Sequence, residues 1–580
     1  MTLVLKPGLN LQSPTANDPL LDLNTQPSLD LQFATSKTLD DAVSGTNLIT
    51  FSRASSGTYV GSDGLIKTSV VNLFTYSEQF DQSAWSKNSS TITPNTTVSP
   101  DGTQTADTLT INTGETFGRL SKLNLGLPSG VYTISYYLKN TINQGTHRVF
   151  FLDPANNQYG VTVKNFSGDS TPEWTRFTAT VDCSASGLSG LNQIRINFRP
   201  IPSPSDGTNT VDVWGAQLEE GSTATDYIPT GATISGAPRF DHDPVTGESL
   251  GLLIEEERSN LVEYSEQFGN WVAPSTAIGN TTTSPSGGTA VGVDSTTCST
   301  ITVTDPSSIT FSCYAKAGSS DYVYLRTVNW GTLARVWFNL ADGSAGSVSS
   351  PSSNITNVTS TDAGDGWYRI SFQLDSTGDN VGNLQITATD ADLNINQVGY
   401  VFAWGAQVET GSFPTSYIPT TSSAVTRAAD VASIEGTNFS SWYNQSEGTL
   451  FADAKITFND ASVSQFPSVY TTNGFPNRLW SLYLNSGSNA ITIGADAFSN
   501  NFGTGVSSPQ TFKVVQAISN TTSNYSASKD GGAVITGNVS AVADQTIMGI
   551  GALPGGTKLI KRLTYYPYRL ADATLQEITS

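Results

Sequence analysis

Short runs in which apolar and polar residues alternate recur along most of this chain. Clear examples are VYTISYYLK at 131–139, WTRFTATV at 174–181, SITFSCYAK at 308–316 and WYRISFQL at 367–374. Alternation with a period of two, in segments rich in Val, Ile, Thr, Tyr and Phe, is typical of strands with one buried face. Turn sequences such as SPDG and STGDN separate the runs. The pattern predicts an all-β chain made of jelly-roll or lectin-like sandwiches.

Two long stretches of the chain are copies of one module. NLFTYSEQF at 72–80 returns as NLVEYSEQF at 260–268, and VWGAQLEEGSTATDYIPT at 213–230 returns as AWGAQVETGSFPTSYIPT at 403–420. Six tryptophans fall at matching places in the two copies, and a buried aromatic side chain covers a large area of core. We therefore expect core packing for the pairs Trp85 and Trp271, Trp174 and Trp367, and Trp214 and Trp404.

The remaining segments differ in style from the modules. The first 47 residues contain four prolines and little periodicity, which favours an extended arm that docks on another protein; removal of residues 1–45 should leave a folded chain. GTYVGSDGLIK and PRFDHDPVTGESLGLLIEE each hold a polar turn between apolar residues, typical of hairpins, and we interpret them as one small β unit split by insertion of the first module. The predicted organisation is an arm at 1–47, a β unit at 48–71 plus 231–259, modules at 72–230 and 260–420, a linker at 421–447, and a third sandwich at 448–580 that ends in a short helix.

Composition limits the possible functions. The chain has 580 residues, too many for one core, and a net charge of −21 from 28 basic and 49 acidic residues. Such an acidic protein is a poor partner for nucleic acid. The apolar runs are too short to cross a membrane and no signal peptide is visible, so we expect no membrane insertion and synthesis in a host cytoplasm.

Little in the sequence indicates catalysis. The two histidines are far apart in sequence, which disfavours a His-based metal site or triad, and the three cysteines are too few for a disulfide framework. Paired carboxylates, as in glycoside hydrolysis, are the best remaining option, at Glu219–Glu220 and Glu255–Glu257. Neighbours on a strand point to opposite faces, so these do not form facing acid pairs. We expect no enzyme and no cofactor.

The quoted motifs resemble a known group of proteins. GTYVGSDGLIK, PRFDHDPVTGESLGLLIEEERSNL, YSEQF and WGAQ…YIPT resemble a cassette of bacteriophage tail and virion-surface proteins, although here a whole module separates the first two. The modules are similar to carbohydrate-binding jelly rolls, and NYSASKDGG with KRLTYYPYRLADATLQEIT resembles laminin-G or concanavalin-like sandwiches. The resemblance implies a structural virion protein. Carbohydrate-binding jelly rolls often hold a structural calcium, which makes Asp101, Asp107 and Asp212, or Asp241 and Asp243, the candidate ligands; solvated turn acids are the alternative.

Aromatic residues that the repeat does not explain are the candidates for glycan contact. Trp330, in the sequence VNWGT, lies in a predicted turn of the second module and has no partner in the first. We expect it to be exposed and to stack on sugar, against the alternative of packing beneath a loop. The accompanying candidates are Asn329, Arg326 and Tyr324, with Trp480 and Tyr470 in the third sandwich.

These observations together favour a tail-fibre-like adhesin on the virion surface that binds host polysaccharide. A capsid decoration protein (head fibre or cement protein) is the first alternative, and a polysaccharide depolymerase is the second. The expected partners are other virion proteins, reached through the arm, the host glycan, and two further copies in a homotrimer.

Overall fold

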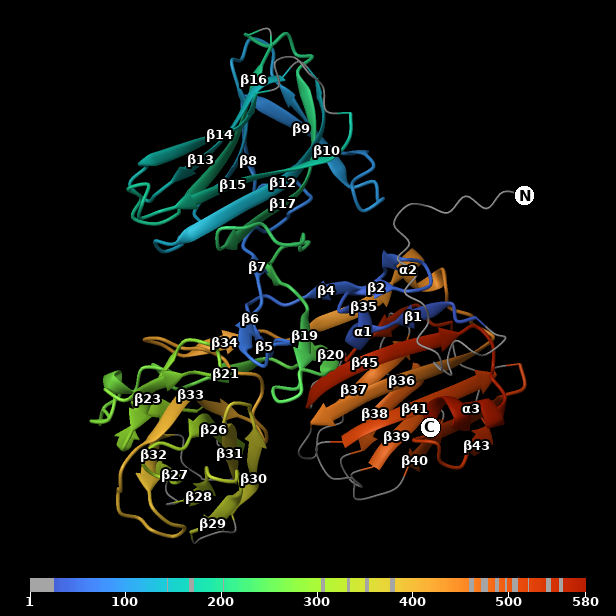
Figure 1. Ribbon diagram of the computed structural model, residues 1–580. Coiled ribbons are helices and arrows are strands. Elements are labelled where there is room, and N and C mark those ends of the chain that lie inside the picture. Colours follow the sequence, from blue (N-terminus) through green and yellow to red (C-terminus); the bar gives the residue numbers. More distant parts are fainter. Residues whose placement is uncertain are drawn as a thin grey trace. The chain divides into compact units, whose positions relative to one another are not determined.

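The computed structural model describes residues 26–580 with internal gaps. The gaps are 143, 166–171, 202, 304–307, 331–333, 350–353, 376–380, 458–463, 471–477, 486–489, 496–497, 503–509, 520, 539–543 and 552–555, and side chains are also not described at 140–144 and 457–510. The described chain is all-β with short helices, as predicted (Figure 1). No helix within these ranges is long and apolar enough to cross a membrane.

The chain divides into two compact units. One holds residues 52–57 and 68–237, and the other holds 1–51, 58–67 and 238–580. The first module is therefore an insertion, as the sequence predicted. Its entry and exit lie together, because Ala237 N–H donates to Val70 O at 2.8 Å and Gly236 N–H donates to Arg53 O at 2.8 Å. The buried Arg53 guanidinium also donates to Ser69 and to Ala237 O.

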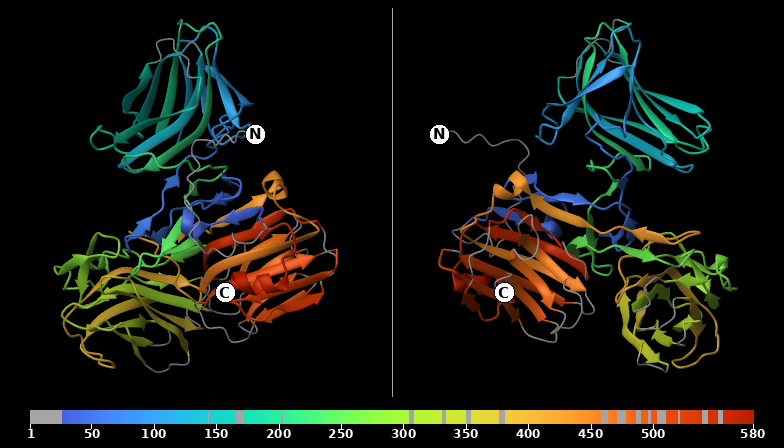
Figure 2. Two further views of the ribbon diagram at one scale, coloured as in Figure 1. Left: turned by 45° about the vertical axis from the view of Figure 1, so that its right-hand side comes forward. Right: turned by 180° about the vertical axis from the view of Figure 1, so that it is seen from behind.

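The first module is a sandwich of two five-stranded antiparallel sheets within the described residues (Figure 2). One sheet has the order β15 (Thr175–Asp182), β12 (Val131–Ile142), β17 (Thr210–Glu220), β10 (Ala106–Ile111), β9 (Ser90–Thr97). The other has the order β14 (Gln158–Asn165), β13 (Gln144–Leu152), β16 (Gln193–Pro200), β11 (Gly118–Lys122), β8 (Ser86–Asn88). Alternate residues such as Ile134, Val149 and Ile196 fill the space between them.

The second module repeats this architecture. Its first sheet has the order β22 (Thr281–Thr283), β23 (Thr289–Val293), β33 (Val401–Thr410), β26 (Ser308–Lys316), β31 (Trp367–Asp375), β30 (Ile355–Asp362). Its second has the order β24 (Ser295–Thr297), β32 (Val381–Thr389), β27 (Tyr322–Val328), β28 (Arg335–Asn339), β29 (Ala345–Val348), with β25 (Ile301–Thr302) on β32. A 3-10 turn at Phe268–Asn270 and the β21 (Arg258–Asn260) to β34 (Val425–Arg427) pair flank the module.

The repeated motifs close each module through buried polar side chains. The Asn260 amide donates to Ala406 O and Ile418 O and accepts from Val408 N–H, and Asn72 makes the same bonds in the first module. Glu409 accepts from the Thr415 N–H and hydroxyl, as Glu219 does from Thr225. The matched sequences are therefore explained by the need to join the first and last segments of a module.

The C-terminal sandwich recruits strands from distant parts of the chain. Its larger sheet has the order β3 (Thr46–Asn47), β2 (Asp40–Asp41), β1 (Leu29–Leu31), β45 (Thr557–Tyr566), β36 (Glu447–Thr457), β41 (Gln510–Ser519), β42 (Asn524–Lys529), β43 (Ile535–Asn538), and β20 (Ser249–Ile254) with β19 (Arg239–His242) also joins β45. The facing sheet has the order β4 (Thr50–Ser52), β35 (Val431–Glu435), β44 (Ile547–Gly549), β37 (Ser464–Tyr470), β38 (Arg478–Asn485), β39 (Ala490–Ala495), β40 (Phe498–Phe502). The helices are α1 (Phe33–Ser36), α2 (Gly436–Ser440) and α3 (Asp572–Thr579), the last burying Leu575 and Ile578 as predicted.

Two predictions about the ends of this sandwich were wrong. Residues 29–47 are not an arm, because β1 pairs with β45 and Leu29 and Leu31 are fully buried. The segment 421–447 is not a linker, since β34, β35 and α2 lie within it. In both places a short strand with few apolar residues gains its burial from a distant partner strand, and local periodicity cannot reveal such a partner.

Candidate functional site

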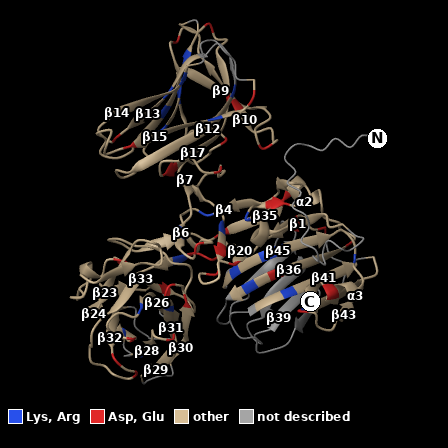
Figure 3. Ribbon diagram, in the orientation of Figure 1, with Lys and Arg blue, Asp and Glu red and all other residues tan. Residues whose placement is uncertain are grey.

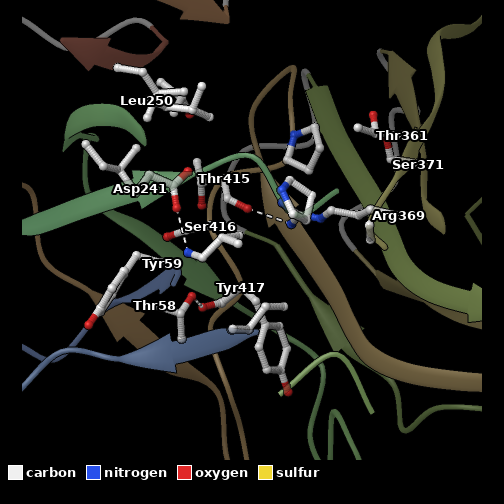
Figure 4. A pocket seen from close by; sticks show the side chains of 18 of the residues that line it. Thr58, Tyr59, Asp241, Leu250, Thr361, Arg369, Ser371, Thr415, Ser416 and Tyr417 are labelled. Carbon is white, nitrogen blue, oxygen red and sulfur yellow. Dashed lines mark hydrogen bonds between the residues drawn. The ribbon is translucent and has the colours of Figure 1, made fainter. Parts of the chain in front are cut away.

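A cavity of about 390 Å³ lies in the larger unit, beside the outer face of the sheet that contains β26 and β31 (Figure 4). The hairpin of β5 (Thr58–Val60) and β6 (Ile66–Thr68) forms part of the wall, together with the β19–β20 hairpin and the loop 412–417. The two hairpins meet, since Val60 N–H donates to Asp241 Oδ1 at 2.6 Å. The two segments therefore contact each other, but they do not form the predicted separate β unit at 48–71 plus 231–259. The β5–β6 hairpin is a sheet of its own, whereas β19–β20 belongs to the larger sheet of the C-terminal sandwich and β4 to its facing sheet.

A buried ion network fixes these walls. Arg239 contacts Glu255 at 2.9 Å and Asp430 at 2.5 Å, with all three side chains almost completely buried. The same guanidinium donates to Thr58 O and to Ser416 Oγ. Because breaking a buried pair leaves an uncompensated charge, the network holds three separate chain segments at one place.

One wall of the cavity is rich in hydroxyl and amide groups. Thr359 and Ser371 share a hydrogen bond of 2.6 Å, and the exposed Asn357 and Thr361 lie on the same strand as Thr359. Strand alternation places these groups on the outer face, opposite the core residues of β31. The wall can therefore donate and accept several hydrogen bonds at once.

The guanidinium of Arg369 and the aromatic ring of Tyr314 lie beside this wall. Arg369 donates to Thr415 O at 2.6 Å and lies 5.4 Å over the Tyr314 ring, and Figure 4 shows it directed toward Thr415. The described residues place no carboxylate within ion-pair distance of it. Arg369 is half-buried, so it presents a fixed positive charge to the cavity.

Two carboxyl groups of the cavity have opposite electrostatic environments. Burial away from water raises the pKa of Asp241 to about 6, although the hydrogen bond that its carboxylate accepts from Val60 N–H acts to lower the pKa. Burial by itself would raise the pKa of Glu255, but Arg427, Arg239 and the bonds from Ser416 hold it well below its usual range. Both Glu255 oxygens already accept bonds from Ser416, and Thr557 adds a third.

The predicted glycan residues of the second module do not form a site. Trp330 is fully buried, packs edge-on against Phe311 and donates to Asn383 O at 3.1 Å. Its predicted exposure was wrong, and the alternative of packing beneath a loop is correct. Tyr324 is also buried, Arg326 bonds Gln385, and Asn329 bonds Asn383 in a left-handed turn. The side chains of Trp480 and Tyr470 lie outside the described residues.

Of the six repeat tryptophans, five are buried as expected and Trp174 is not. Trp174 is half-buried and donates to Val98 O at 2.9 Å, whereas its partner Trp367 is 1% exposed. In the second module Ile66 of the β5–β6 hairpin, together with Ala363 and Phe402, packs on the buried cluster that contains Trp367, and the Trp367 indole donates to Thr283 O at 3.1 Å. The alternation of apolar and polar residues is the same in both modules, so it cannot show whether another segment packs over the tryptophan.

The candidate calcium ligands of the first module accept hydrogen bonds from nearby protein groups and do not converge on one point. Asp107 accepts Phe80 N–H and Asn95 N–H, Asp212 accepts the Thr108 hydroxyl, and Asp101 accepts Thr103 N–H in its own turn. In the part of the chain that the structure describes, no group of three or more His, Cys, Asp or Glu could hold a metal ion.

Sequence reasoning missed most of the cavity. Thr359, Ser371 and Arg369 lie on the outer face of predicted strands, and Ser416 lies in a repeated motif that served only to define the module. The available signal was the PRFDHDPVTG hairpin, whose Asp241 was considered only as a turn acid or calcium ligand.

No protein-family profile and no curated protein sequence matches this chain. The CBM40 module of the Ruminococcus gnavus IT-sialidase is similar at 16% identity and a TM-score of 0.21, over 24% of this chain and 84% of that one. An enzymatically active domain of bacteriophage CBA120 tailspike protein 4 is similar at 16% identity and a TM-score of 0.20, over 26% and 21%. A tandem CBM22 domain of Paenibacillus barcinonensis Xyn10C is similar at 10% identity and a TM-score of 0.20, over 59% and 98%. Likenesses this distant do not decide what the chain binds.

Proposed function

We propose that this chain is a non-enzymatic, glycan-binding adhesin on the surface of a bacteriophage particle. The observation that carries the binding role is the cavity of about 390 Å³, with its hydroxyl wall and its fixed cation. Its volume lies in the range of small-molecule sites, at the lower end, which suits one or two sugar units. The phage origin is supported by the resemblance of the GTYVGSDG, PRFDHDPVTG and YSEQF segments.

The chemistry of the walls suits a sugar better than an apolar ligand. Sugar hydroxyls need partners that both donate and accept, and Asn357, Thr359 and Thr361 provide such groups at the cavity. Phe413 and Tyr59 add apolar surface for the C–H faces of a ring. Arg369 then offers a charge-assisted bond to a ligand oxygen.

The test compares Arg369→Met with Arg176→Met on an array of immobilised bacterial surface glycans. Arg176 occupies the same repeat position, donates to Ser135 Oγ and lies 5.6 Å over Tyr137, but it does not line the cavity. Both changes keep an aliphatic stem over the ring, so similar melting temperatures are expected. Only Arg369→Met should weaken glycan binding, by about tenfold. Equal affinity of the two variants would refute the cavity as the binding site.

Hydrolysis of polysaccharide is a second candidate function, favoured by one observation. Asp241 has a pKa of about 6, whereas Glu255 has a pKa well below its usual range. Glycosidases use two carboxyl groups with separated pKa values in this way, one as the general acid and the other in its ionised form. Glu255, however, is saturated by hydrogen bonds and cannot approach a substrate carbon. We expect no reducing ends above background. Release that falls as the pH rises through 6, and that Asp241→Asn abolishes, would establish a depolymerase instead.

The number of copies of this protein on each virion distinguishes a tail location from a capsid location. Attachment to other virion proteins and a homotrimeric state belong to the same proposal. Labelled particles imaged at low resolution should show a few copies near the tail. Hundreds of copies over the head would assign the chain to capsid decoration.

A further inference from the structure

The outer face of the β14-β13-β16-β11-β8 sheet in the first module is unusually basic for this protein. Its five strands contain no Asp or Glu, and Arg119, Arg148, Arg195 and Arg199 lie on this face; Lys87 lies opposite the core residue Leu120, and Lys122 is buried. The other sheet of the same module carries Asp107, Asp182, Asp212, Glu219 and Glu220. In a chain of net charge −21, this concentration on one sheet is a marked departure from the average (Figure 3).

Cross-strand register arranges these side chains in two rows. Residues directly opposite one another on paired strands share a face of the sheet. The first row across the strands is Asn88, Arg119, Asn197, Arg148 and Thr162. The second row is Ser86, Ser121, Arg195, Phe150 and Gly160. Their neighbours in sequence, such as Leu120, Ile196 and Val149, point into the core, so both rows face outward.

The arginines are held in place without ion-pair partners. Arg119 Nε–H donates to Asn197 Oδ1 at 2.9 Å, and Arg195 donates to Gln193 Oε1 at 3.1 Å. Arg148 lies 4.8 Å over the Phe150 ring, and a side chain at Gly160 would collide with that ring. In the described part of the chain no carboxylate lies within ion-pair distance of Arg119, Arg148 or Arg195.

The charges repel one another and remain accessible. Partial burial, followed by the nearby Arg195 charge, lowers the pKa of Arg119. The three arginines and Phe150 are only half-buried, and Thr162, Gly160 and Arg199 are exposed. In the second module the matching face also holds a half-buried arginine pair, Arg326 and Arg335, but the buried Tyr324 and Trp337 beside them, 4% and 1% exposed, replace the open row found in the first module.

We propose that this face of the first module binds an acidic polysaccharide through the carboxylates of its sugars. Arg119 and Arg148 lie two strands apart, about 10 Å, which allows each to pair with a separate carboxylate along one glycan chain. Asn197, Thr162 and Gln193 provide partners for sugar hydroxyls, and Phe150 provides a ring for stacking. A nucleic acid is a poorer fit, because its denser phosphates would meet the negative field of the rest of the protein.

The experiment measures binding of the full chain to immobilised polymannuronate, with neutral dextran and single-stranded DNA beside it. We expect salt-dependent binding to polymannuronate, none to dextran and weaker binding to DNA. The double change Arg119→Gln with Arg148→Gln should weaken polymannuronate binding by about tenfold or more. The matched control, Lys139→Gln with Arg176→Gln, removes the same charge from the other sheet and should bind as before.

Two further variants keep the result interpretable. Arg148→Lys retains the charge without the planar fork, so it should fold normally and show an intermediate loss. Arg369→Met at the cavity of the other unit should leave polymannuronate binding unchanged, which separates this proposal from the proposed cavity. Equal loss in the control pair, absence of binding at low salt, or tighter binding to DNA would each overturn the assignment.

Discussion

At the scale of single residues, buried polar groups with complete hydrogen bonding specify the modules. Asn72 and Asn260 each bind two carbonyls and accept backbone N–H groups, and Glu219 and Glu409 are fully buried. Such groups are costly when a partner is lost, so they enforce one way of closing the sandwich. The same residues would be costly to replace individually, although they touch no ligand.

Trp330→Ala should destabilise the second module by roughly 3–5 kcal/mol, because it empties a fully buried site and removes a bond to Asn383 O. Denaturant unfolding measures this loss. The control is Trp174→Ala, where the half-buried ring should cost clearly less. An unchanged unfolding free energy for Trp330→Ala would contradict the buried position.

The sequence alone predicts well which face of a strand a side chain lies on, but it predicts poorly whether another segment packs over that face. The matched tryptophans and the alternating strands predicted the core of each module. Trp330 was predicted to be exposed because it lies in a turn with no partner in the other copy, but it packs against Phe311 of β26 and donates to Asn383 O of β32, two strands outside its own turn. Arg369 and Ser371 lie on a face that becomes a cavity wall only when the two hairpins fold over it.

At the scale of elements, the short strand β1 is an integral part of the C-terminal sandwich. Leu29 and Leu31 are fully buried, and Asp30 accepts two bonds of 2.8 Å from the Arg562 guanidinium on β45. A buried pair that loses one partner leaves a charge without compensation. The strand therefore contributes both apolar burial and charge pairing from only three residues.

Deletion of residues 1–31 should therefore lower the unfolding free energy of the larger unit by several kcal/mol, because the burial of Leu29 and Leu31 and the pairing of Asp30 with Arg562 are both lost. Deletion of residues 1–25 is the reference, so that the difference between the two truncations isolates residues 26–31. Thermal unfolding followed by near-ultraviolet circular dichroism compares the two. Equal melting of both truncations would show that β1 is dispensable, as the expected arm would be.

At the scale of the whole molecule, one module is inserted into another unit through neighbouring residues. Ala237 N–H donates to Val70 O at 2.8 Å, and β7 (Val71–Asn72) pairs with β18 (Ser235–Gly236) just beyond them. Insertion is tolerated when the ends of the inserted module lie together. Among the residues that the structure describes, the core clusters of the larger unit consist of residues from that unit alone.

Replacing residues 71–236 with two glycines should give a folded, shorter protein, because a two-residue turn can connect Val70 to Ala237. The product should melt cooperatively at nearly the temperature of the larger unit in the full chain, as calorimetry would show. It should keep glycan binding at the cavity and lose binding to polymannuronate. Aggregation of the shortened chain would contradict the independence of the two units.

The contact between Val70 and Ala237 also determines how the chain transmits mechanical load. Tension along the polypeptide crosses from residue 70 to residue 237 through these bonds and through Arg53, so the sheets of the first module bear no force while the contact holds. Because β7 and β18 are antiparallel and loaded at the same end, they open one bond at a time. A pulling experiment should record a weak early rupture here, followed by a separate and stronger event as the module itself unravels and releases its length.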